Sequence, residues 1–199
     1  MLKVFGDVWS GNCYKVKLVL TQLRVPFEWV PVDILKSESR TPAFLAKNPN
    51  GRVPMVELDD GTCLAESNAI LWYFAEGTAL VPDSKLARAQ ALQWMFFEQY
   101  SHEPNIATSR YIMRYLGNPP EKKAALAARV EPGYAALGVM EKHLGARAFF
   151  AGEKYSIADM ALYAYTHCAG EGGFDLGRFP AVRAWLSRVE SQPLYMPMG

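Results

Sequence analysis

The first part of the chain alternates short apolar runs with turn residues, a pattern typical of strands joined to helices. Residues 2–5 predict a buried strand that ends at Gly6, and residues 7–12 predict a loop. A helix should follow and end at Val25-Pro26, because the residue before a proline disfavours helical backbone. Its apolar face carries Val16, Val19, Leu20 and Leu23. Residues 27–32 predict a second strand, which should run parallel to the first since a helix joins them.

The pattern then changes to a hairpin followed by a helix. Residues 39–47 predict a short helix with Pro42 in its first turn. Residues 54–58 and 62–65 predict two strands, and Asp59-Asp60-Gly61 supplies the hairpin turn between them. Ser67 is expected to cap the next helix, with Ile70, Tyr73 and Phe74 on its buried face. The predicted order is therefore β-α-β-α-β-β-α.

Strand patterns disappear beyond residues 76–85, which hold Gly, Pro and polar residues and predict a linker. Residues 86–116 predict a long helix interrupted near Pro104, and a kink is expected at Glu131-Pro132-Gly133 inside another. Ser156 and Asp159 have the spacing of a helix capping box. A last helix begins at Phe179-Pro180. The sequence thus predicts an α/β domain at residues 1–78 and an all-helical domain at 86–199.

Composition and charge narrow the possible functions. The chain has 199 residues, of which 50% are hydrophobic and 21% charged, as in an ordinary globular protein. A net charge of +1 gives no field that attracts nucleic acid or an anionic membrane. No apolar run reaches membrane-spanning length, and no signal peptide is expected. Three well-separated cysteines favour a reducing cytoplasm over a disulfide scaffold, and the three histidines lack metal-ligand spacing, so no metal site is expected.

The hairpin and the start of the following helix form a corner with useful chemistry. An extended backbone at Val53, before Pro54, can pair with a peptide as an added strand. A helix N-terminus at Ser67 offers N–H groups to a carboxylate, and Glu66 offers a negative charge to an ammonium. A ligand with a peptide backbone, an α-carboxylate and an α-amine suits all three groups. The same residues also fit a hairpin followed by an ordinary capped helix.

Two motifs in this corner resemble a known family. Asn-Pro-x-Gly-x-Val-Pro from residue 48 and Glu-Ser-x-Ala-Ile from residue 66 are similar to the glutathione-binding half of the cytosolic glutathione transferases. The resemblance implies a thioredoxin-like first domain, a cis Val53-Pro54 bond, and Ser-x-x-Asp at 156–159 as the motif of the helical domain. It also implies that Val53 and Pro54 bind the cysteinyl backbone of glutathione, while Glu66 and Ser67 hold its γ-glutamyl group. For the glycine carboxylate, Arg52 is the first candidate, with Lys36 and Arg40 as alternatives.

The loop before the first helix would receive the sulfur of glutathione. Ser10 matches in position the serine that donates to the thiolate in serine-type members of the family, and Asn12 matches an asparagine found near the sulfur in some bacterial members. Both residue types are also common helix caps. Cys13 stands three residues after Ser10, the spacing of a Cys-x-x-Cys motif that lacks its first cysteine, so it is expected to be a packed thiol. A bound glutathione could still act as the nucleophile of a disulfide reductase.

The resemblance implies a second, hydrophobic substrate between Val8 and Trp9 and the first helices of the helical domain, where Tyr100 and Tyr111 are candidates. The expected function is transfer of the glutathione thiolate to a small hydrophobic electrophile, in a cytoplasmic homodimer and with no cofactor besides glutathione as co-substrate. Two alternatives stay open. One is a glutathione-dependent peroxidase or disulfide reductase, and the other is a non-catalytic glutathione-fold binding module.

Overall fold

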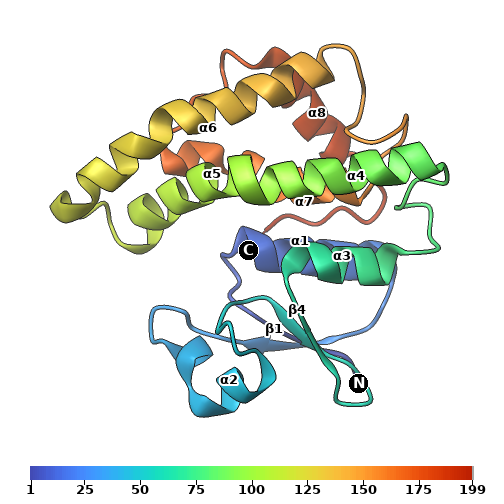
Figure 1. The fold of residues 1–199 in the computed structure, drawn as a ribbon, viewed down its shortest axis with the longest axis vertical. Helices are drawn as coiled ribbons and strands as arrows, with labels where there is room; N and C mark the ends of the chain where they lie inside the picture. Colours follow the sequence, from blue (N-terminus) through green and yellow to red (C-terminus); the bar gives the residue numbers. More distant parts are fainter. Residues whose placement is uncertain (199) are drawn as a thin grey trace. The chain divides into compact units, whose positions relative to one another are not determined.

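The computed structural model describes residues 1–198 and divides into two units (Figure 1). The first unit holds residues 1–78 together with residues 193–198, and the second holds Ala79–Gln192. The last residues return to the first unit, where the Tyr14 hydroxyl donates to the carbonyl of Met196 at 2.6 Å. The sequence analysis assigned all of residues 86–199 to the helical domain, whereas in the structure residues 193–198 belong to the first unit.

The first unit is built on one four-stranded sheet with the strand order β2-β1-β3-β4. The β1 and β2 strands pair in parallel, as the helix between them predicts, whereas β3 pairs antiparallel with both β1 and β4. The hairpin turn closes through a hydrogen bond from the Leu58 amide to the Thr62 carbonyl, and Gly61 supplies the positive φ of 85° that this turn needs. The strands are β1 (Lys3–Gly6), β2 (Glu28–Pro31), β3 (Met55–Glu57) and β4 (Cys63–Ala65).

Alternation along the strands places apolar side chains on both faces of this sheet. Val4 and Val56 are paired in register and fully buried. The next residues, Phe5 and Met55, point to the opposite face and pack in a cluster with Phe44, whose ring meets the Phe5 ring edge to face. Both faces are therefore covered. The helices of this unit are α1 (Gly11–Gln22), α2 (Pro42–Lys47) and α3 (Ser67–Ala75), with a 3-10 turn at Glu38–Arg40.

The α1 and α3 helices lie side by side on the sheet (Figure 1). The buried face of α3 differs from the prediction: Ile70, Leu71 and Ala75 are fully buried, whereas Tyr73 is 52% exposed. The buried stripe of α3 consists of Ser67, Ile70, Leu71 and Ala75. It is rotated around the helix axis relative to the predicted stripe, which included Tyr73. The short helix contains too few turns for apolar spacing to select between these faces.

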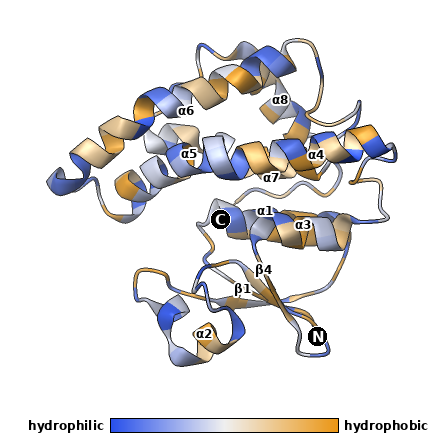
Figure 2. Cartoon of the chain, in the orientation of Figure 1, coloured by the Kyte–Doolittle hydropathy of each residue, from blue (hydrophilic) through white to orange (hydrophobic). Residues whose placement is uncertain are grey.

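The second unit consists entirely of helices over its described residues, and polar and apolar residues alternate along α4 and α6 as helices with one buried face require (Figure 2). The interruption predicted near Pro104 is a π-helical segment at Glu98–His102, directly before the helix that contains this proline. The helices are α4 (Lys85–Phe97), α5 (Glu103–Arg110), α6 (Lys123–Leu144), α7 (Ile157–Thr166) and α8 (Pro180–Glu190). A second π-helical segment lies at Tyr111–Tyr115, and 3-10 turns lie at Pro120–Lys122 and Ala169–Gly172.

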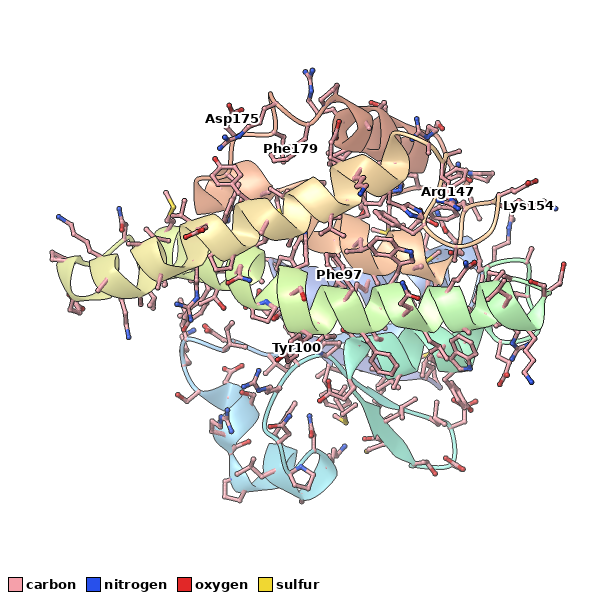
Figure 3. All side chains as sticks on the ribbon, turned by 45° about the horizontal axis from the view of Figure 1, so that its top comes forward. Phe97, Tyr100, Arg147, Lys154, Asp175 and Phe179 are labelled. Carbon is pink, nitrogen blue, oxygen red and sulfur yellow. The ribbon has the colours of Figure 1, made fainter. Side chains whose placement is uncertain are left out.

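Pro132 and Gly133 lie inside α6, which continues through them as one helix. Packing explains the glycine: a Cβ atom at position 133 would run into the ring of Phe174. The Tyr134 ring meets the Phe174 ring edge to face, with 5.2 Å between the ring centroids. Tyr134 also stacks on Phe179, which is labelled in Figure 3 on the segment before α8. Gly133 therefore makes room for an aromatic cluster at the cost of helical propensity.

The capping box predicted at the start of α7 is present. Asp159 is fully buried, and its carboxylate accepts hydrogen bonds from the backbone amides of Ser156 and Phe150 and from the indole nitrogen of Trp185, at 3.0, 3.1 and 2.9 Å. One carboxylate thus joins the start of α7 to a loop and to α8. Within residues 1–198, no helix is long and apolar enough to cross a membrane.

Candidate active site

The Val53-Pro54 peptide bond is cis, as the resemblance to the glutathione transferases implied. Pro54 is buried and Val53 half-buried directly before β3, and the ladder of β3 with β1 and β4 involves residues 55–57 only. The preceding loop is held in place by Asn48, whose side-chain amide donates to the carbonyl of Arg52 at 2.8 Å. Val53 therefore stands at the end of a strand, outside the ladder, where a peptide can pair with its backbone.

The start of α3 differs in detail from the prediction. Ser67 is the first residue of the helix and Glu66 is the N-cap residue, with no hydrogen bond from its side chain to the helix backbone. Glu66 has φ 68° and ψ 111°, a positive-φ conformation that is uncommon for a non-glycine residue and concentrates at functional sites. The prediction that Ser67 caps the helix is wrong, because Ser67 already lies inside the helix as its first residue. Its hydroxyl donates to the Asn12 side-chain oxygen at 3.2 Å.

The consequence is a helix N-terminus whose backbone N–H groups receive no capping side chain from Glu66. Glu66 is exposed, and its carboxylate accepts a long hydrogen bond of 3.5 Å from Asn50. Ser67 beside it is buried. The corner thus offers donors and a helix dipole to an anion, with an exposed carboxylate one residue away for a cation.

A buried lysine completes this corner, and the sequence analysis missed it. Lys15 on α1 is fully buried, and its ammonium donates to the Ser67 hydroxyl and to the Asn68 side-chain oxygen, each at 3.4 Å. A signal was present in the sequence: Lys15 lies between Tyr14 and Val16 and four residues before Val19, on the apolar face predicted for this helix. Lysine is almost never fully buried without polar partners, so a lysine in such a run points to oxygens packed against the helix.

Ser10 is the N-cap residue of α1, and its hydroxyl oxygen accepts a hydrogen bond of 3.4 Å from the Cys13 amide. The loop before it is fixed by Asp7, which accepts from the amides of Trp9 and Ser10. A hydroxyl has two lone pairs and one proton. Capping uses a lone pair, so the proton of Ser10 stays available to an external acceptor, and the capping and donor roles are compatible.

Cys13 is a packed thiol. It is fully buried, and a Cβ atom on Gly6 would come within 2.9 Å of its sulfur. Burial raises the pKa of the Cys13 thiol to about 12, although hydrogen bonds with Ser10 and Asp7 oppose the shift. The thiolate is the reactive form of cysteine, so Cys13 is unsuited to nucleophilic chemistry near neutral pH.

The cations proposed for a glycine carboxylate differ in their surroundings. Lys36 forms an ion pair of 3.0 Å with Asp33, which raises the pKa of Lys36, and Arg40 donates to the Asn50 carbonyl at 3.0 Å. Arg52 is exposed. Arg52 thus remains the first candidate by its place in the sequence.

The residues predicted to contact a hydrophobic substrate are all exposed, but they belong to different units. Val8 and Trp9, next to Ser10, are 43% and 45% exposed on the first unit. Tyr100 and Tyr111 belong to the second unit, and Tyr100, labelled in Figure 3, is 88% exposed. Exposed apolar side chains beside Ser10 suit a nonpolar ligand, and the assignment of the two tyrosines stays a prediction.

The sheet, its helices and the cis proline define the first unit as a thioredoxin-like domain, followed by a helical domain. The family models for the glutathione S-transferase N-terminal and C-terminal domains match residues 9–76 and 105–193. The chain belongs to the glutathione S-transferase family. Glutathione S-transferase 3 of Zea mays is 31% identical over 98% of this chain and 91% of its own length.

Solved structures agree with this result. The glutathione S-transferase of Pseudomonas fluorescens is 56% identical, covers 99% of this chain and 98% of its own, and superposes with a TM-score of 0.97. A glutathione transferase of Pseudomonas putida, solved with one glutathione disulfide bound per subunit, is 25% identical over 97% of this chain and 88% of its own, with a TM-score of 0.84.

Proposed function

We propose that this enzyme binds glutathione at the corner formed by Val53, Glu66 and Ser67 and transfers its thiolate to a small hydrophobic electrophile. The observation that supports the proposal is that Met55 pairs with Ala65 across β3 and β4, so that Val53-Pro54 and Glu66-Ser67 continue from neighbouring strand ends. The Val53 backbone pairs with the cysteinyl backbone, the first turn of α3 takes the γ-glutamyl carboxylate, and Glu66 takes the γ-glutamyl ammonium. Arg52 is proposed to face the glycine carboxylate.

Ser10 is proposed to stabilise the thiolate, with Asn12 as a second polar group near it. A free thiol with a pKa of ~8.5 must fall by roughly two units to be mostly ionised at neutral pH, which corresponds to about 2.7 kcal/mol. A hydrogen bond to a charged group contributes about 1.5–3 kcal/mol. The N-terminus of α1 adds roughly 0.3–1 kcal/mol. One hydroxyl and one helix end are therefore sufficient, and the thiol proton is released to solvent.

The reaction then forms one carbon–sulfur bond. The thiolate attacks an electrophilic carbon, and either a leaving group departs with its electron pair or an activated double bond accepts the pair and takes a proton from solvent. The exposed apolar side chains of Val8 and Trp9 beside Ser10 are proposed to contact the electrophile. A role in detoxification is consistent with such substrates.

The test compares Ser10→Ala and Cys13→Ser with the parent enzyme. Ser10→Ala should raise the pKa of bound glutathione by roughly one to two units, because the thiolate loses a donor and the neutral thiol loses little. Cys13→Ser should titrate like the parent. Thiolate absorbance measured against pH separates the variants. Activity that is abolished by Cys13→Ser and retained by Ser10→Ala would overturn the proposed role of Ser10.

A second candidate function is reduction of disulfides or peroxides through bound glutathione. This candidate is supported by the related Pseudomonas putida structure, which contains a bound glutathione disulfide. Activity on a mixed disulfide or a peroxide, compared with activity on a generic electrophile, distinguishes the two reactions. Equal turnover of the electrophile with and without Ser10, at the uncatalysed rate, would instead indicate a non-catalytic binding module.

We further propose a cytoplasmic homodimer. The exposed apolar side chains of Tyr73 on α3 and of Leu86 and Phe96 on α4 support an interface on those helices. Sedimentation at micromolar concentration should give the mass of a dimer, and a monomeric mass would contradict the proposal. The three cysteines, all free thiols in this structure, suit a reducing compartment.

A further inference from the structure

A chain of three polar side chains runs from the interior of the first unit to the start of α3. Lys15 donates to the Ser67 hydroxyl at 3.4 Å, and Ser67 donates to the Asn12 side-chain oxygen at 3.2 Å. Lys15 comes from α1 and Ser67 from α3, two helices that lie side by side (Figure 1). Both Lys15 and Ser67 are buried.

The proton inventory of this chain has one arrangement. An ammonium can only donate, so Ser67 accepts from Lys15 with a lone pair. The single proton of Ser67 must then point away from Lys15, and in this structure it points to Asn12. Lys15 therefore fixes the Ser67 hydroxyl as a hydrogen-bond donor, with its proton directed away from Lys15.

Charge reinforces this arrangement. The N-terminus of α3 carries a partial positive charge of roughly half an electron, and the Lys15 ammonium lies within one hydrogen bond of its first residue. Placing a buried ammonium beside a positive helix end is unfavourable in itself. An anion bound at the first turn of α3 would interact favourably with both, and more strongly than in water because Lys15 is shielded from solvent.

We propose that Lys15 is a positioning residue for the α-carboxylate of the γ-glutamyl group. The inference rests on the proposed function, in which this carboxylate binds at the start of α3. On binding, the Ser67 proton turns from Asn12 to a carboxylate oxygen, while Lys15 keeps donating to the Ser67 hydroxyl and contributes its charge. Lys15 acts through Ser67 and does not touch the reacting sulfur.

The experiment removes the charge on the protein and the carboxylate on the ligand in turn. Calorimetry compares glutathione with 4-aminobutyryl-cysteinyl-glycine, which is glutathione without its α-carboxylate, for the parent, Lys15→Met and Lys15→Arg. Lys15→Met should weaken glutathione binding roughly tenfold and change binding of the truncated tripeptide by less than about twofold. Lys15→Arg should restore most of the affinity for glutathione. Lys17→Met, on the same helix, is the matched control and should change neither affinity.

Kinetics supply a second readout. Lys15→Met should raise KM for glutathione while kcat changes little, because the carboxylate is remote from the sulfur. An equal loss of affinity for both ligands would show a purely structural role and overturn the inference. A parent enzyme that fails to bind glutathione would instead overturn the proposed function, so the two failures are distinguishable.

If Lys15→Met does not fold, a crystal structure of the parent enzyme with glutathione decides. Ser67 Oγ should lie within hydrogen-bond distance of both Lys15 Nζ and a γ-glutamyl carboxylate oxygen. A carboxylate bound away from Ser67, or a Lys15 ammonium turned away from it, would overturn the inference.

Discussion

Asp159→Ala should destabilise the helical unit, and the structure allows the size of the effect to be worked out. The carboxylate accepts from three buried N–H groups, those of Phe150, Ser156 and the Trp185 indole. It also accepts from the Ser156 hydroxyl at 3.2 Å. The alanine variant leaves the three N–H donors without this acceptor, at about 1–3 kcal/mol each, or roughly 6 kcal/mol together.

One gain opposes this loss. Burial raises the pKa of Asp159 to about 6 from 3.8, although hydrogen bonds from Trp185, Phe150 and Ser156 hold it down. A shift of about two units means that the buried charge costs about 3 kcal/mol at pH 7, a cost that the alanine variant avoids. The expected net loss in the free energy of unfolding at pH 7 is therefore about 3 kcal/mol.

The same shift predicts how the loss depends on pH. Between pH 3.8 and about 6 the folded parent binds a proton at Asp159 that the unfolded chain has released, so this residue contributes most stability below about pH 4 and loses it as pH rises through about 6. The protonated carboxyl can donate to the Ser156 hydroxyl and keep its other bonds. The difference between the parent and Asp159→Ala should thus grow from about 3 kcal/mol at pH 7 to about 6 kcal/mol near pH 4.

Urea unfolding followed by circular dichroism, at one fixed protein concentration, measures this difference at each pH. Trp185→Phe removes one of the three N–H donors and keeps the carboxylate. Because this donor holds the pKa of Asp159 down, its loss should cost less at pH 4 than at pH 7, which is the opposite trend to Asp159→Ala. A loss below 1 kcal/mol at pH 7 would refute the count of orphaned donors. A loss that is the same at both pH values would refute the raised pKa.

Three further predictions follow from single contacts. Iodoacetamide should alkylate the half-buried Cys63 well before Cys13, whose pKa is about 12, and peptide mass spectrometry that found the opposite order would contradict the packed thiol. Gly133→Ala should lower the free energy of unfolding by about 1–3 kcal/mol, because the new methyl group meets Phe174. Gly138→Ala on the same helix has no neighbour within 4 Å and should be neutral or stabilising by up to about 1 kcal/mol. Urea unfolding compares the two variants. Glu66→Ala should weaken glutathione binding by removing the partner of its ammonium, with Glu76→Ala as control, and unchanged affinity in calorimetry would exclude Glu66 from the site.

The fold class and most helix and strand positions could be predicted from the sequence because they depend on local patterns. The hairpin turn at Asp59-Asp60-Gly61 and the capping box at Ser156 are signals of a few adjacent residues. The return of the chain to the first unit could not be predicted in this way. It depends on the Tyr14 hydroxyl reaching Met196, 182 residues away in sequence. The π-helical form of the interruption before Pro104 was not predicted, because a π-helix is defined by backbone hydrogen bonds, which side-chain periodicity does not reveal.

The candidate site shows the same division. The Val53-Pro54 bond is cis, as the resemblance implied, and Glu66 stands at the start of α3, whereas the roles of both toward a ligand stay predictions. The role of Ser67 differs from the prediction, because α3 begins one residue earlier than predicted, so that Glu66 is the N-cap residue and the Ser67 hydroxyl bonds to Lys15 and Asn12 on the facing helix. Local propensity loses at this position to a tertiary hydrogen bond, which is expected where a fold builds a binding site.

Lys15 shows how such a site can nevertheless be found. Its helix is buried on nearly every side, with Cys13, Tyr14, Lys15 and Val16 in succession. A helix buried all round is normally apolar throughout, so a lysine within it must have oxygens within reach to offset the loss of hydration. Those oxygens need not be near in sequence, and Ser67 is 52 residues away. A charged residue inside an unbroken buried run is therefore a reason to look for a polar partner on the facing helix, and where that partner stands at a helix N-terminus, the pair favours an anion.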